Sequence, residues 1–161
     1  MNYLVRGVPQ SVADEVRRTR RSPGYGHPAH DELAGGTGPC RCCLKPFAPG
    51  VDHRLLFTYR PPGRDETLTA PGPVFIHSGH CEAWSGDGFP EALRELPLAL
   101  EARAPRSRVT GLCTPGDADV DARIRTLLGQ ADVEWLHVRH AEAGCFIATV
   151  EKKGPAVSRG A

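Results

Sequence analysis

The chain has 161 residues, of which 40% are hydrophobic and 24% charged, as in an ordinary globular protein. The formal net charge is only +1, so charge gives no reason to expect nucleic acid or an anionic membrane surface as a partner. No apolar stretch approaches the ~20 residues that span a membrane, and the first apolar run is too short for a secretory signal, so we expect a cytoplasmic location.

The first part of the chain predicts a strand, a helix and a long loop. Residues 2–6 have the composition of a short strand, and Ser11 is the expected N-cap of a helix that ends near Arg21. Residues 22–39 are rich in Gly and Pro and predict a loop. Four arginines close the helix, and we interpret them as a solvated helix end rather than a phosphate-binding patch: Arg17, Arg18, Arg20 and Arg21.

Strands dominate the rest of the chain. Apolar runs predict strands over 53–59, buried on both faces, and over 74–77. Two strand pairs follow, at 97–103 with 107–113 and at 133–139 with 144–151. Between these pairs, residues 117–129 carry apolar side chains at helical spacing and end in Gly129, which predicts a helix.

This order of elements predicts an α+β fold. We expect one domain over residues 1–152, with a largely antiparallel sheet, two helices on one face and long Gly/Pro-rich loops. Residues 153–161 are expected to form a frayed C-terminal tail.

Two short motifs predict a metal site. Cys40 and Cys43 have the Cys-x-x-Cys spacing at which two thiolates of one turn bind the same ion, and His77 and Cys81 offer two further ligands where a strand becomes a loop. Three cysteines and one histidine are a common structural zinc set, so zinc is the cofactor that these residues predict. Cys42 and His80 are spare candidates.

Two other interpretations of the same residues stay open. The three cysteines are also small enough to be buried apolar residues, with His77 bonded to a loop carbonyl. Cys40 and Cys43 could instead form a redox-active thiol pair, although no thioredoxin-like strand and helix surround them.

Two weaker constellations complete the inventory. Tyr59 and Arg60 are expected either to line a small-ligand pocket together with His77 and the 38–45 loop, or simply to cap a strand end. His137, His140 and Cys145 could place a thiol beside a histidine across a strand pair, but a packed thiol beside a hydrogen-bonded histidine explains them as well. The sequence contains no phosphate-binding loop, dinucleotide fingerprint or common hydrolase motif.

Four segments resemble a known family. They are Gly38-Pro39-Cys40-Arg41-Cys42-Cys43-Leu44, Leu55-Leu56-Phe57-Thr58-Tyr59-Arg60-Pro61, Gly72-Pro73-Val74-Phe75-Ile76-His77, and His137-Val138-Arg139 with Gly144-Cys145-Phe146. They are similar to the bacterial family called domain of unknown function 1203, over most of the chain to about Lys152. The family has no assigned activity. Its members often show Pro-Tyr-x-Glu where this chain has Thr67-Leu68-Thr69-Ala70, so an activity that needs those residues would be altered here.

Three functional hypotheses follow. The first is a binding module with a structural zinc ion and a small-molecule or protein partner. The second is an enzyme that uses a cysteine thiolate or an open metal position near His77, and the third is a thiol redox protein that uses Cys40 and Cys43.

Overall fold

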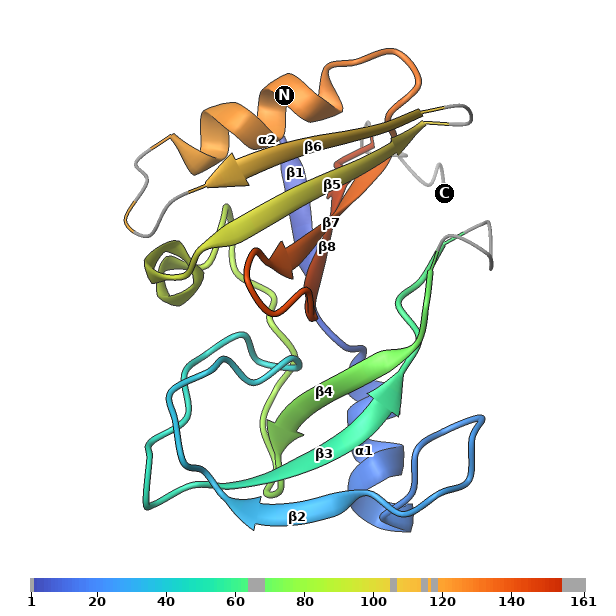
Figure 1. Ribbon diagram of the computed structural model, residues 1–161, viewed down its shortest axis with the longest axis vertical. Coiled ribbons are helices and arrows are strands. Elements are labelled where there is room, and N and C mark those ends of the chain that lie inside the picture. The colour runs from blue at the N-terminus through green and yellow to red at the C-terminus, as the bar shows by residue number, and fades with distance from the viewer. Residues whose placement is uncertain (1, 64–68, 105–106, 114–115, 117–118, 155–161) are drawn as a thin grey trace, which may run out of the picture.

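A computed structural model describes residues 2–63, 69–104, 107–113, 116 and 119–154 (Figure 1). The elements in chain order are β1 (Tyr3–Arg6), α1 (Gln10–Thr19), β2 (His30–Leu33), β3 (His53–Tyr59), β4 (Gly72–His77), the 3₁₀ helix η1 (Glu91–Glu95), β5 (Leu98–Ala104), β6 (Ser107–Cys113), α2 (Val120–Leu128), β7 (Trp135–His140) and β8 (Phe146–Lys152). This arrangement confirms the predicted α+β class with antiparallel strands.

One sheet has five strands in the order β1-β8-β7-β5-β6, and each pair of neighbours is antiparallel. Helix α2 covers one face of this sheet (Figure 1). Its buried residues Ile124 and Leu128 belong to the same core as Leu100 and Leu136 of the sheet. Burial of these large apolar side chains, each worth roughly 1.5–3 kcal/mol, holds the helix on the sheet.

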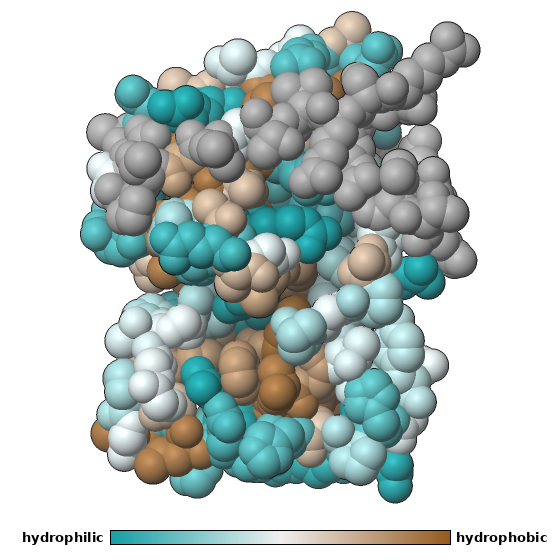
Figure 2. Space-filling view, in the orientation of Figure 1, coloured by the Kyte–Doolittle hydropathy of each residue, from teal (hydrophilic) through white to brown (hydrophobic). Residues whose placement is uncertain are grey.

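The second sheet has three strands in the order β2-β3-β4, and α1 packs against it. Val16 of α1 shares a buried core with Leu55 of β3 and Ile76 of β4. The opposite face carries the cross-strand pair Leu56 and Phe75, which is only partly buried. Figure 2 shows apolar surface gathered in the lower half of the view, where this sheet lies.

Three expectations need correction. The strands form two sheets instead of one, and each sheet has its own helix. Residues 22–39 are not all loop, because β2 forms within them by pairing with the edge of β3. Strand β3 is buried on one face only, at Leu55 and Phe57, because nothing comparable to α1 covers its other face in the described part of the chain.

The helix ends also differ in detail. Pro9 is the N-cap of α1, so Ser11 lies inside the first turn and does not cap it. Helix α2 begins at Val120 with Asp119 as N-cap; the predicted start at Asp117, the turn at 105–106 and the tail from 155 lie outside the described residues. The two helices have 10 and 9 residues, and no helix in the described part is long and apolar enough to cross a membrane.

Candidate metal centre

Cys40 and Cys43 lie in a tight turn that points both sulfurs the same way. The Leu44 N–H donates to the Cys40 carbonyl at 2.9 Å, and the Cys40 N–H donates to the Lys45 carbonyl at 2.9 Å. Leu44 adopts a φ of 58°, a left-handed conformation that a leucine rarely takes and that lets the chain reverse here. A backbone N–H of Cys43 also bonds the Cys40 sulfur. We call residues 40–44 the cysteine turn.

His77 and Cys81 complete a cluster of four ligand groups. His77 ends β4 and Cys81 follows four residues later; the metal-ligating atoms of Cys40, Cys43, His77 and Cys81 all lie within 4.8 Å of one another. The sulfurs of Cys40 and Cys81 are 3.8 Å apart, and the Cys43 sulfur is 3.6 Å from Nδ1 of His77. The predicted convergence is therefore present, and the cluster could hold a metal ion.

The His77 ring is oriented by two neighbours. Its Nε2 lies 3.3 Å from Oδ2 of Asp52, and the Phe47 ring packs against it with centroids 4.7 Å apart. A proton on Nε2, donated to Asp52, leaves the lone pair of Nδ1 facing the thiols, which is the arrangement of histidine ligands in metal sites. The pKa of Asp52 is lowered, chiefly because the Ala48 N–H donates to it and further because of His77. The carboxylate is thus present to hold the ring.

Arg17 of α1 contacts the cluster directly. Its Nη2 lies 2.9 Å from the Cys81 sulfur, and its Nε donates to the His77 carbonyl at 3.1 Å. The side chain of Arg17 is only 10% exposed, whereas Arg18, Arg20 and Arg21 are exposed. The interpretation of the four arginines as a solvated helix end is therefore wrong for Arg17.

The thiols are electrostatically coupled. Hydrogen bonds from the Cys40, Cys42 and Cys43 thiols lower the pKa of Cys81, and the Arg17 charge lowers it further. Bonding to Cys40 and Cys81, together with burial, raises the pKa of Cys43. A bound cation would replace the thiol protons of the cluster, since metal ligands bind in their deprotonated form.

The cysteine turn also lies at the junction of the two sheets. The Arg41 N–H donates to the Phe75 carbonyl of β4 at 2.8 Å, and the Arg41 carbonyl accepts from the Val8 N–H at 2.7 Å. The buried Arg41 guanidinium donates to the Phe146 carbonyl of β8 and to the Pro39 carbonyl, each at 2.7 Å. Three distant segments are therefore tied to this one turn.

The two spare candidates lie outside the four-atom set. Cys42 is fully buried and its thiol bonds Cys81, but it is not among the groups that share a common centre. His80 is exposed and does not join the cluster. All six cysteines lie in the described part of the chain, and none forms a disulfide there.

The predicted pocket of Tyr59, Arg60 and His77 does not form. The β3–β4 register pairs Tyr59 with Gly72 and His77 with Arg54, at opposite ends of the ribbon. Five residues of strand, about 17 Å, separate the two ends. Tyr59 lines a different pocket from the metal cluster, and the Arg60 side chain donates to the Thr69 carbonyl at 3.1 Å.

The thiol–histidine pair of the terminal strands is also absent. In the β7–β8 register, Thr149 lies opposite His137. Cys145 precedes β8, in the turn that joins the two strands. His137 is fully buried with Nε2 3.0 Å from the Pro62 carbonyl. Nδ1 of His140 accepts from backbone N–H groups of its own turn.

Sequence reasoning missed Arg17 and Asp52. Gln10, Asp14 and Arg17 are spaced at i, i+4 and i+7, so they share one helix face. Gln10 accepts from the Ala83 N–H at 2.7 Å and donates to the Cys81 carbonyl at 3.1 Å, which fixes that face on the ligand segment. The spacing was a usable signal, but nothing local pointed to Asp52.

Among the comparisons with known proteins, only the comparison with family models gives a match. No curated protein and no solved structure matches the chain. A family model described as protein of unknown function (DUF1203) matches residues 37–152, a range that includes all four cluster residues but not α1. The chain therefore belongs to the DUF1203 family of proteins of unknown function.

Proposed function

We propose that this protein binds one zinc ion through Cys40, Cys43, His77 and Cys81, and that the ion has a structural role. Tetrahedral zinc with bonds of about 2.3 Å to sulfur and about 2.0 Å to nitrogen implies sulfur–sulfur distances of about 3.8 Å and sulfur–nitrogen distances of about 3.5 Å. Two of the six ligand pairs, at 3.8 Å and 3.6 Å, are close to these distances, and all four ligand atoms lie within 4.8 Å of one another. This agreement is the observation that carries the proposal.

Charge also favours zinc. Three thiolates and a neutral imidazole leave a Zn²⁺ site with one net negative charge. The guanidinium of Arg17, at 2.9 Å from the Cys81 sulfur, offsets that charge where water is largely excluded. A fully thiolate site would be less well matched by a single arginine.

A structural role fits the surroundings better than catalysis. Four protein ligands fill a tetrahedral ion, whereas catalytic zinc keeps one position open for water. Cys40 and Cys43 are buried, and the turn they share holds β4, β8 and the β1–α1 connection through Arg41. Zinc would brace this junction, and the two sheets would behave as the single domain expected over 1–152. Thiol ligands also suit a reducing compartment, in keeping with a cytoplasmic location.

Metal analysis and chelation test the proposal. Protein purified without added metal should contain one zinc per chain, and a strong chelator should lower the melting temperature by about 10 °C, a shift that corresponds to about 3–5 kcal/mol. Adding zinc back should restore it. The proposal is contradicted if the protein is purified without metal, or if removing the metal with the chelator leaves the melting temperature unchanged. A zinc-bound water would support the open-site enzyme, and a readily oxidised Cys40–Cys43 pair without metal would support the redox alternative.

Asp52→Asn should weaken zinc binding without unfolding the protein. Asparagine keeps an oxygen for the Ala48 N–H but loses the charge that holds the His77 ring. Outer-shell partners of this kind contribute about 10–100-fold in affinity, so we expect about 10-fold weaker binding in chelator competition. Asp31→Asn is the matched control, because Asp31 also lies 3.3 Å from a histidine, His53, outside the cluster. Equal zinc affinity in both variants would contradict the orienting role.

A further inference from the structure

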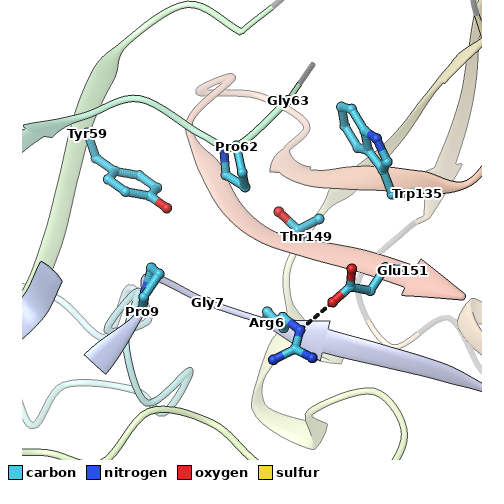
Figure 3. Close-up of a pocket in the computed structure, with 9 residues that line it drawn as sticks. All are labelled: Arg6, Gly7, Pro9, Tyr59, Pro62, Gly63, Trp135, Thr149 and Glu151. Carbon is cyan, nitrogen blue, oxygen red and sulfur yellow. Dashed lines mark hydrogen bonds and ion pairs between the residues drawn. The ribbon is translucent and has the colours of Figure 1, made fainter. Parts of the chain in front are cut away.

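A second site lies at the end of the β3–β4 ribbon opposite to the metal cluster. A pocket of about 350 Å³ opens between the five-stranded sheet and the segments that follow β1 and β3 (Figure 3). This volume is at the small end of the range for ligand pockets. The pocket shares no residue with the four cluster groups, so what it binds is independent of the zinc proposal.

Its walls are mainly aromatic rings and prolines. Tyr59 and Trp135 lie on opposite sides of the pocket, with Pro62 between them (Figure 3). The Trp135 ring packs on the buried His137 ring with centroids 4.7 Å apart, and His137 lies against the Pro62 carbonyl. The wall is therefore held by packing before any ligand arrives, which lowers the entropic cost of binding.

Two hydroxyl groups lie at this apolar space: that of Tyr59, and that of Thr149, which is buried and has no hydrogen-bond partner among the described residues. The Tyr59 hydroxyl points into the pocket (Figure 3), and Tyr59 makes no hydrogen bond within the described part of the chain. Burial raises the pKa of Tyr59 to about 12, so the hydroxyl is a neutral donor at physiological pH. Its ring is fixed by contacts with Phe57 and Phe146. A carbonyl oxygen is the acceptor that such a donor would recognise.

The charges at the rim compensate each other. Arg6 and Glu151 form an ion pair at the pocket edge (Figure 3). A ligand with a carboxylate would compete with Glu151 for Arg6, and a cationic ligand would compete with Arg6 for Glu151. Both exchanges leave one protein charge without its partner, so the rim favours an uncharged ligand.

We propose that this pocket binds a small, uncharged aromatic molecule that carries a carbonyl group. The flat ring would lie between Tyr59 and Trp135 in offset or edge contact, and the carbonyl would accept from the Tyr59 hydroxyl.

Three molecules of nearly the same shape test this site: benzamide, benzoate and benzamidine. Titration of the full chain is followed by the two tryptophan indole N–H signals in ¹H–¹⁵N spectra. Benzamide should shift the Trp135 signal with a Kd on the order of 1 mM, as expected for so small a molecule. The Trp84 signal should not move, since Trp84 does not line the pocket. Both charged analogues should bind at least about tenfold more weakly.

Tyr59→Phe should weaken benzamide binding about 5–10-fold, the effect of one lost hydrogen bond. It keeps the ring and its packing, so the melting temperature should be unchanged. Tyr25→Phe is the control, because Tyr25 is 44% exposed and does not line the pocket. The proposal is overturned if benzamide leaves the Trp135 signal unmoved, if Tyr59→Phe binds it as well as the unaltered chain, or if either charged analogue binds as tightly as benzamide.

Discussion

Replacing Cys43 with serine is expected to lower zinc affinity by more than about 100-fold, beyond the 10–100-fold effect of losing an outer-shell partner. Serine offers a protonated hydroxyl in place of the thiolate, so the set with Cys40, His77 and Cys81 falls to three ligands. Because metal binding and folding are coupled, the melting temperature should fall together with the zinc content, by about 10 °C.

The matched control is Cys113→Ser. Cys113 is as buried as Cys43, at 3% against 5% exposure, but it lies in the core of the five-stranded sheet. Both variants put a hydroxyl in place of a buried thiol, so they share the packing cost. Only Cys43→Ser should lose zinc in metal analysis. Loss of zinc from both variants would mean that zinc content merely follows stability.

Cys42 gives the experiment a second arm. Its thiol is buried beside Cys81 and is the nearest substitute for a lost ligand. If Cys43→Ser keeps a full complement of zinc and Cys42→Ser alone loses it, Cys42 is the ligand and the assignment of Cys43 is wrong. If Cys43→Ser already loses zinc, the assignment holds.

Much of the fold could be predicted because its strands carry apolar runs. Strands β3 and β6 have the predicted bounds, and the terminal strand pair differs by one or two residues. Strand β2 could not be predicted, because His-Asp-Glu-Leu has one apolar residue and half-buried alternation is absent. It is held by cross-strand pairs instead, such as Arg54 with Glu32 at 2.7 Å. Those pairs exist only once β3 is in place.

The metal cluster could be predicted for a similar reason. Cys40 and Cys43 belong to one turn, and His77 and Cys81 to one strand end, so each half is encoded locally. The pocket of Tyr59, Arg60 and His77 was predicted because these residues all lie near strand ends, but the sequence does not give the register that decides which strand ends are neighbours. Antiparallel pairing sends Tyr59 and His77 to opposite ends of the ribbon, and no local pattern contains that information.

Gly7→Ala is expected to destabilise the protein by about 3 kcal/mol or more. A Cβ on Gly7 would lie 2.1 Å from the Arg41 carbonyl oxygen and 3.1 Å from that of Cys42. Both carbonyl oxygens belong to the backbone, so the clash can be relieved only by moving the chain. Adding atoms to a packed core usually costs about 1–3 kcal/mol, and we expect the cost here to lie at or above the top of that range because the neighbours are rigid. The Val8 N–H to Arg41 bond of 2.7 Å would be strained by the same shift. Chemical denaturation measures the change in the free energy of unfolding.

Gly35→Ala is the control for this glycine, because a Cβ there meets nothing within 4 Å and its φ is not positive. Its effect on the free energy of unfolding should stay within about 0.5 kcal/mol.

The same denaturation measurement on Gly7→Ala tests whether the two sheets fold as one domain. Gly7 follows β1 and touches the cysteine turn, so the clash in Gly7→Ala should disturb both β1 and the metal cluster. One cooperative transition, shifted as a whole and accompanied by weaker zinc binding, is expected. Two separate transitions, with only one of them shifted, would mean that the sheets are independent units joined at a turn.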